Sequence, residues 1–241
     1  PLTYNYTRMF QDAVFKRSIG NTFLYLIIEV PIMLVLAILL AQLLNNKDLK
    51  FKGLFRTCVF LPCATSLVSY ALIFKSLFAT QGLINTILVK LGILENNFNF
   101  LGTGWSAKII IIVALIWRWT GYNMIIILAG LQSIPNDYYE AATIDGANAF
   151  HKFVNITVPM LKPVILFSTI LSTIGTLNLF TEPYLLTNGG PNNSTISLGL
   201  YIYRQAFQSI NLTYAATISV AILVIVGVLS RLQMKVGENT K

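Results

Sequence analysis

The sequence has few charged side chains for its length. Only 11% of the 241 residues are charged, whereas a soluble globular domain usually carries about 25%. Hydrophobic residues make up 55% of the chain, so much of its surface must face lipid rather than water. The scarcity of charge therefore excludes an ordinary soluble domain and indicates a membrane protein.

Residues that bind metals or perform catalysis are also scarce. The chain has two cysteines and one histidine. Cys58 and Cys63 lie in one apolar segment at an offset that does not place them on one helix face, so we interpret them as packing residues. His151 has no carboxylate or cysteine partner nearby in the sequence. We therefore expect no catalytic residue, no metal site and no cofactor bound by this chain, and a membrane enzyme is disfavoured.

The formal net charge of +8 does not indicate a nucleic-acid-binding protein. A nucleic-acid surface would gather its bases into a stripe or patch. The bases of this chain stand mainly at the ends of apolar runs, where Lys and Arg anchor helices to the membrane interface. We expect membrane lipid as a partner, and no nucleic acid.

Five apolar segments are long enough to cross a bilayer, which takes about 20 residues. Membrane helices tolerate internal prolines such as Pro31, and Pro163 is placed to open the fourth helix. The pattern predicts an all-α, polytopic transmembrane helix bundle that forms one domain over residues 1–241. The predicted spans are residues 19–44, 57–78, 107–131, 161–185 and 214–232.

The bases also predict an orientation. Residues 45–56 contain four bases, Lys47, Lys50, Lys52 and Arg56, against a single acid, Asp48. The positive-inside rule places this short loop in the cytoplasm. Alternation then places residues 132–160 and the C-terminus inside, and residues 1–18, 79–106 and 186–213 outside. An odd number of spans with an external start predicts that a further helix precedes Pro1.

The internal loop at residues 133–160 has its own pattern. Pro135, Asn136 and Asp137 are a helix-start signal, with Asn136 or Asp137 free to cap the helix. Asp145 and Gly146 predict a break or chain reversal. A second short helix follows, and we expect it to end at Pro159. The pattern predicts two helices with a turn between them along the cytoplasmic face.

The same loop resembles a known signature. Membrane subunits of binding-protein-dependent ABC importers carry an EAA loop, which reads E-A-A, three residues, G, nine residues, I-x-L-P. The matching residues in this chain are Glu140, Ala141, Ala142, Gly146, Ile156 and Pro159. Val158 replaces the leucine, which keeps the position apolar. The spacing is specific, and it implies the core of a type I ABC importer permease.

The resemblance implies a role for the loop and a set of partners. In the family, this element is a coupling helix that docks on a cytoplasmic ATPase subunit. The expected coupling residues are Glu140, Ala141, Ala142, Asp145, Gly146, Ala147 and Pro159. The expected partners are a second permease subunit, ATP-binding cassette subunits that use ATP and Mg, an extracellular solute-binding protein and the transported sugar. The implied location is the bacterial plasma membrane, and the chain itself is implied to be a transport subunit rather than an enzyme.

Other segments resemble the carbohydrate permeases of the maltose and multiple-sugar type. The sequence I-D-G-A at residues 144–147, the entry I-G-N-T at residues 19–22 and the external loop T-N-G-G-P at residues 187–191 carry this similarity. They imply a di- or oligosaccharide as cargo. Two alternatives remain open: an ABC permease for an amino acid, phosphate or an ion, and a secondary transporter that needs no ATPase.

Polar and aromatic residues inside the spans are candidates for the translocation path. Charges in lipid are costly and tend to face a cavity or a partner, and aromatic faces stack on sugar rings while amides and charges bind hydroxyls. Trp and Tyr also form ordinary interfacial belts. The candidates are Arg118, Trp119, Tyr122, Asn123, Asn178 and Glu182, and Glu29 is a further buried charge.

Overall fold

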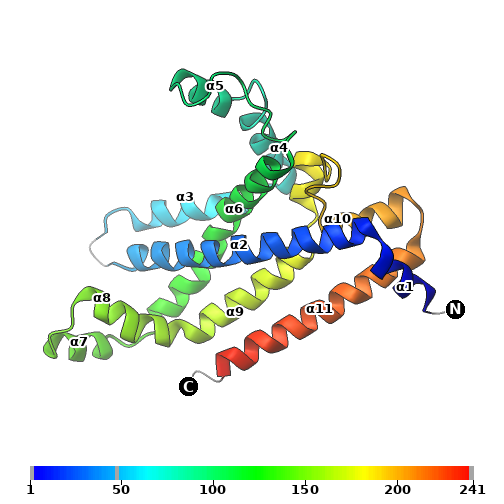
Figure 1. Cartoon of the computed structure of the whole chain (residues 1–241). Coiled ribbons are helices and arrows are strands. Elements are labelled where there is room, and N and C mark those ends of the chain that lie inside the picture. Colours follow the sequence, from blue (N-terminus) through cyan, green and yellow to red (C-terminus); the bar gives the residue numbers. More distant parts are fainter. Residues whose placement is uncertain (1–2, 47–48, 239–241) are drawn as a thin grey trace. The chain divides into compact units, whose positions relative to one another are not determined.

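The computed structural model describes residues 3–46 and 49–238, and in these ranges the regular structure is helical (Figure 1). The all-α fold expected from the apolar segments is confirmed. The helices are α1 (Tyr4–Gln11), α2 (Ala13–Asn45), α3 (Lys52–Ala64), α4 (Leu67–Leu77), α5 (Leu83–Lys90), α6 (Gly104–Gln132), α7 (Asn136–Ile144), α8 (Ala149–Lys152), α9 (Val158–Leu177), α10 (Leu198–Tyr203) and α11 (Leu212–Glu238), with π-helical turns η1 (Phe153–Thr157), η2 (Pro183–Thr187) and η3 (Arg204–Gln208).

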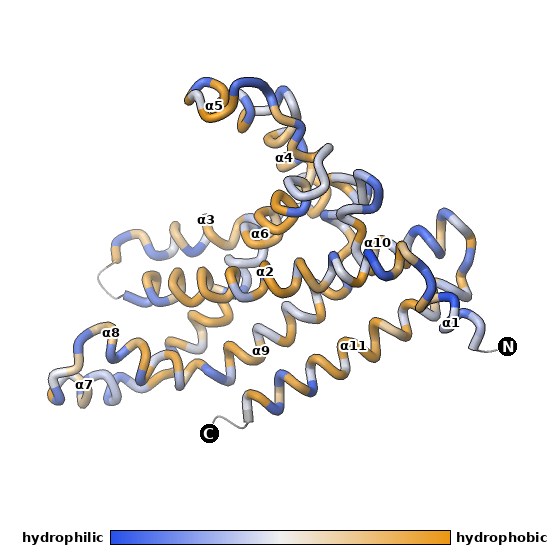
Figure 2. Tube along the Cα trace, in the orientation of Figure 1, coloured by the Kyte–Doolittle hydropathy of each residue, from blue (hydrophilic) through white to orange (hydrophobic). Residues whose placement is uncertain are grey.

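Four stretches of the described helices are long and apolar enough to cross a membrane. They are Ala13–Asn45, Gly104–Gln132, Ala149–Leu177 and Leu212–Gly237, and α3 with α4 makes a fifth if the two count as one broken span. Figure 2 shows hydrophobic residues along most of α2, α6, α9 and α11, with hydrophilic residues gathered toward helix ends and connections. This distribution is the one that a lipid-facing bundle requires.

Two of the predicted spans differ from the helices. The second, residues 57–78, is not one helix, because α3 ends at Ala64 and α4 begins at Leu67. Pro62 lies inside α3, in its last turn. The predicted second span is therefore divided between two helices with a bend of 95° between them.

The helix of the fourth span starts and ends earlier than predicted. The continuous helical stretch runs from Ala149 to Leu177 rather than over residues 161–185, so Pro163 lies inside α9 and does not open it. Pro159 also lies within the helical stretch, one residue after α9 begins, instead of ending the preceding helix. The π-helical turn η1 comes directly before it, and this wider turn relieves the crowding of a proline ring against the backbone one turn earlier.

The chain divides into two compact units, and each boundary falls inside a long helix or at the break between α3 and α4. Unit 1 consists of Pro1–Glu29, Thr65–Ile116 and Thr173–Val228; unit 2 consists of Val30–Ala64, Trp117–Ser172 and Leu229–Lys241. Unit 2 thus collects the basic loop, the EAA loop and the C-terminal segment. These are the three regions that the charge pattern assigns to the same side of the membrane, so the grouping agrees with the predicted alternation.

The core of unit 1 forms where α10 and the start of α11 pack against α1 and the start of α2. Its buried apolar side chains include Phe15, Leu198 and Ile218. Polar side chains of α2 fix the segment before α10: Asn21 Nδ2 donates to the Ile196 carbonyl at 2.9 Å, and Tyr25 OH donates to the Thr195 carbonyl at 3.1 Å. These bonds satisfy backbone groups that would otherwise be unpaired in the interior.

Asp12 links three of these helices. Its Oδ1 atom accepts hydrogen bonds from the backbone N–H groups of Val14 at 2.8 Å and Phe15 at 3.2 Å, which caps the start of α2. Its Oδ2 atom accepts hydrogen bonds from the hydroxyls of Tyr201 in α10 and Tyr214 in α11. Partial burial raises the pKa of Asp12, but the tyrosine hydroxyls and the backbone donors outweigh it and hold the pKa below its ordinary value of 3.8.

We expect Asp12→Asn to destabilise the protein at neutral pH. Hydrogen bonds to a charged group contribute on the order of 1–3 kcal/mol, and the amide cannot accept from all these donors with the same strength. A lowered pKa in the folded state means that the contribution is complete above the ordinary value of 3.8 and is lost as the pH falls through the lower folded-state value. Thermal unfolding of the detergent-purified protein should show the deficit at pH 5 to 8 and a shrinking deficit toward about pH 3. Glu95→Gln, at an exposed position, is the control, and an equal deficit in it would contradict the assignment.

Candidate coupling loop and polar groups of the spans

The predicted coupling loop folds as two helices joined by a tight turn. Helix α7 ends at Ile144, and the turn has the hydrogen bonds of a Schellman motif. The Gly146 N–H donates to the Thr143 carbonyl at 3.1 Å, and the Ala147 N–H donates to the Ala142 carbonyl at 2.9 Å. Gly146 has φ of +77°, a left-handed conformation that glycine adopts without strain. The predicted break at Asp145 and Gly146 therefore corresponds to a defined C-cap.

The start of α7 differs from the prediction. The helix begins at Asn136, its N-cap is Pro135, and no side chain caps it. The expectation that Asn136 or Asp137 would cap the helix was wrong, because both residues already have a place inside the first turn. Asp137 still stabilises this end through the helix dipole, since it is an acid in the first turn.

The second part of the loop is capped and tied back to α7. The Asn148 side chain accepts a hydrogen bond from the His151 N–H at 2.9 Å, which caps α8. Lys152 Nζ donates to Thr143 Oγ1 at 2.7 Å, and the hydroxyls of Tyr139 and Thr157 lie 3.0 Å apart. These two contacts join α7 to α8 and to η1. They hold the two parts of the loop together across the Gly146 turn.

The surface of this loop is unusually apolar for a solvent-facing segment. Neither α7 nor α8 has a buried residue. Ile144 is 88% exposed and Phe150 is 71% exposed, and both flank the Gly146 turn. Glu140, Ala141, Asp145 and Pro159 are also exposed, while Ala142 and Ala147 are partly buried. Large apolar side chains displayed beside an acidic helix are typical of a surface that docks on a partner.

Unit 2 brings four of the predicted path residues together on α6. Arg118 is 5% exposed, and its guanidinium donates to the carbonyls of Pro62 at 3.1 Å and Cys63 at 3.2 Å. These carbonyls belong to the last turn of α3. Arg118 therefore caps the broken end of α3, and its charge complements the negative end of that helix.

The neighbouring path residues of α6 form a partly buried aromatic and amide group. The Trp119 and Tyr122 rings meet edge to face with centroids 5.9 Å apart. Asn123 is buried, and its Nδ2 donates to Met33 Sδ at 3.2 Å and to the Trp119 carbonyl at 3.1 Å. Its Oδ1 atom is buried with no hydrogen-bond partner in residues 3–46 and 49–238. A buried amide oxygen without a partner is uncommon in folded proteins, and it marks Asn123 among the path candidates of α6.

The other acidic and amide candidates lie in unit 1. Glu29 and Glu182 are 2% and 3% exposed, and their carboxylates are near enough to repel each other. Thr176 Oγ1 donates to Glu29 Oε2 at 3.0 Å, and Tyr70 OH donates to Glu182 Oε1 through a long contact of 3.5 Å. Asn178 is exposed and donates to the Ile174 carbonyl near the end of α9. No group of three or more His, Cys, Asp and Glu side chains suited to a metal ion occurs in the described ranges.

The match to a protein family decides the class of the chain. The model of a family described as "Binding-protein-dependent transport system inner membrane component" matches residues 13–235. The chain belongs to this family. The expected ABC importer permease, a multi-pass transport subunit of the bacterial inner membrane rather than an enzyme, is thus confirmed.

Curated and solved relatives of this permease cover almost all of it. It is 48% identical to the lactose transport system permease protein LacF of Rhizobium radiobacter, over 99% of this chain and 81% of the relative. It is 38% identical to the multiple sugar-binding transport system permease protein MsmF of Streptococcus mutans, over 98% and 80%. A chain in the crystal structure of a bacterial alginate ABC transporter, in complex with an alginate pentasaccharide-bound periplasmic protein, is 26% identical, with a TM-score of 0.84 over 95% of this permease and 80% of that chain.

Sequence reasoning missed one residue that shapes unit 2 of the permease. A Cβ atom on Gly121 of α6 would lie 2.0 Å from the Val59 carbonyl oxygen of α3. The two helices can approach this closely only because residue 121 has no side chain. Gly121 lies three residues after Arg118, on the face of α6 that meets α3. The sequence shows the glycine but does not show that α3 packs against it, so its role could be recognised only from the structure.

Proposed function

We propose that this permease is the membrane-spanning subunit of an ATP-driven, binding-protein-dependent importer of a di- or oligosaccharide. The similarity to LacF over 99% of the chain carries the proposal. Other relatives include an arabinooligosaccharide permease at 36% identity and the multiple-sugar permease at 38%. An amino-acid transporter structure aligns at 16% identity with a TM-score of 0.60, which shows a shared fold alone.

In this proposal, the exposed face around Gly146 docks on a cytoplasmic ATPase subunit. Glu140 supplies the charged contact, and Ala141 and Ala142 let the partner approach closely. Ile144 and Phe150 supply the apolar area that the docked complex buries. Asp145, Gly146 and Ala147 form the turn, and Pro159 fixes the start of α9. The ATPase, rather than this chain, binds and hydrolyses ATP with Mg.

The proposed assembly has further partners. A second permease subunit completes the translocation path, and an extracellular solute-binding protein delivers the sugar. Within this chain, Arg118, Trp119, Tyr122, Asn123, Asn178 and Glu182 are the proposed path residues. The best supported is Asn123, whose buried Oδ1 atom can accept a sugar hydroxyl. The weakest is Asn178, whose amide already donates to its own helix.

We expect Glu140→Lys to separate the permease from its ATPase and to abolish sugar uptake. Reversing a charge at a docking face replaces an attraction with a repulsion, and such juxtapositions cost several kcal/mol. The measurement is the amount of ATPase that co-purifies with the permease, together with uptake in reconstituted vesicles. Because residue 140 is exposed, insertion and folding should be unchanged.

Glu95→Lys is the matched control, since it makes the same charge change at an exposed residue on the predicted outer side. It should retain the ATPase and transport at the original rate. Normal ATPase recovery and normal uptake in Glu140→Lys would overturn the assigned coupling role.

A further inference from the structure

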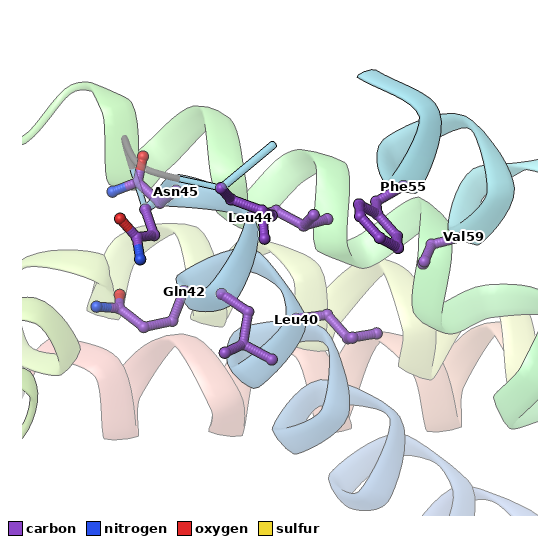
Figure 3. A pocket seen from close by; sticks show the side chains of 9 residues that line it. Leu40, Gln42, Leu44, Asn45, Phe55 and Val59 are labelled. Atoms are coloured by element: carbon purple, nitrogen blue, oxygen red, sulfur yellow. The ribbon is translucent and has the colours of Figure 1, made fainter. Parts of the chain in front are cut away.

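A pocket of about 610 Å³ lies between the last turns of α2 and the facing side of α3 (Figure 3). Its volume is within the range of about 300–1,000 Å³ that is usual for small-molecule sites. All of its lining residues belong to unit 2. It is separate from the coupling loop and from the polar residues of α6.

The lining of this pocket is amphipathic. Figure 3 shows the amides of Gln42 and Asn45 toward one end of the pocket, and Phe55 and Val59 toward the other. A soluble polar ligand would leave the apolar walls without partners, whereas an amphiphile can contact both the amides and the walls. The shape and chemistry therefore fit an amphiphile, with its polar group among the amides and its chain along the apolar walls.

The charge of the loop around the amide end is predominantly positive. Residues 45–56 contain four bases, Lys47, Lys50, Lys52 and Arg56, and one acid, Asp48, and the first turn of α3 has no acidic residue. Arg56 Nη2 donates to the carbonyl of Leu44, which lines the pocket, at 3.4 Å. Its Nε atom is buried with no hydrogen-bond partner in the described part of the chain. These donors favour an anionic polar group over a neutral or cationic one.

We propose that this pocket binds one acyl chain of an anionic phospholipid, whose phosphate group lies among the amides and bases at the start of α3. The predicted cytoplasmic position of this loop agrees with the assignment, because anionic lipids of that leaflet attract juxtamembrane Lys and Arg. The apolar walls distinguish the site from a general attraction of bases to the membrane surface. They hold a chain in one place, whereas a diffuse attraction requires no pocket.

The test is lipid binding to the complete importer complex, purified in detergent and analysed by native mass spectrometry without sugar or ATP. The probes are phosphatidylglycerol and phosphatidylcholine with identical acyl chains. We expect the complex to retain phosphatidylglycerol preferentially. Lys50→Gln combined with Lys52→Gln should lower its apparent affinity about twenty-five-fold, from roughly a fivefold contribution of each base. Arg231→Gln combined with Lys235→Gln removes as many bases on the same predicted side and should change nothing.

A second pair of variants tests the walls. Leu40→Trp fills the pocket and should exclude the lipid, whereas Leu39→Trp adds the same ring at an exposed neighbouring position outside the pocket. Equal retention of the two phospholipids, equal affinity in the two glutamine pairs, or unchanged binding to Leu40→Trp would each overturn the proposal. A neighbouring subunit found seated in the pocket would do the same. None of these outcomes depends on the cargo or on ATPase coupling, so they leave the proposed transport function untouched.

Discussion

Gly146→Val should reduce sugar uptake by about tenfold or more while the permease still inserts and folds. Residue 146 has φ of +77°, and an added Cβ atom would meet nothing within 4 Å. The variant therefore introduces backbone strain without a clash. A non-glycine residue in the left-handed region costs of order 1–3 kcal/mol, and a β-branched residue is at the upper end. The exposed turn can relieve this strain by changing conformation, which removes the arrangement of α7 and α8 that we propose docks on the ATPase.

The chain contains a matched control for this variant. Gly92 follows α5 with φ of +71° and open space around its Cβ position. Its N–H donates to the Val89 carbonyl at 3.0 Å, and the Ile93 N–H donates to the Leu88 carbonyl at 3.0 Å, which is the same Schellman arrangement. Gly92→Val thus carries the same strain in a loop predicted to be outside.

Uptake and ATPase co-purification should be nearly normal in Gly92→Val and strongly reduced in Gly146→Val. Equal losses in the two variants would show a general effect of strain on folding and would count against the coupling role of residues 136–152. The two glycine variants test whether coupling depends on the shape of the loop. Glu140→Lys tests separately whether coupling depends on the charge of the loop.

The features predictable from the sequence were those fixed by local pattern. The third span, predicted at residues 107–131, corresponds to α6 from Gly104 to Gln132, because its apolar run has clear polar ends. The turn at Gly146 was predictable because glycine after a helix is a local signal. The spacing of the EAA signature pointed to the same turn, and Gly146 is exposed in the structure.

The features that sequence reasoning missed depend on residues far apart in the chain. Pro62 can be tolerated within a helix or can end one, and its position alone does not decide which. Arg118, more than fifty residues later, donates to the carbonyls of Pro62 and Cys63 at the end of α3. Its two hydrogen bonds to α3 give it a structural role beside the proposed role in the path. The shifted fourth span has a similar origin, since η1 lets the helix continue through Pro159.

The second large effect is expected for Gly121→Ala, which should separate α3 from α6. The added Cβ atom would lie 2.0 Å from the Val59 carbonyl oxygen and 2.8 Å from its carbonyl carbon. Both contacts are with backbone, so no side-chain rotation can relieve them. Overpacking of this kind typically costs about 1–3 kcal/mol and occasionally more.

The damage should extend beyond the site of the clash. Arg118 lies one turn from Gly121 on the same helix, and its bonds to Pro62 and Cys63 require the close approach that residue 121 allows. Moving the helices apart would break the two hydrogen bonds that the buried guanidinium makes with α3, and this loss adds to the cost of the clash. We therefore expect a large loss of thermal stability in detergent and a reduced yield of folded protein.

Gly227→Ala is the control for this change. Gly227 is in α11, and a Cβ atom there would meet nothing within 4 Å. Alanine is the better helix former by roughly 1 kcal/mol, so this variant should unfold at the original temperature or slightly above it. Fluorescence-detected size-exclusion chromatography after heating measures both proteins. If Gly121→Ala survives heating as well as Gly227→Ala does, α3 and α6 do not need their close contact, and the end of α3 must be held by something other than Arg118.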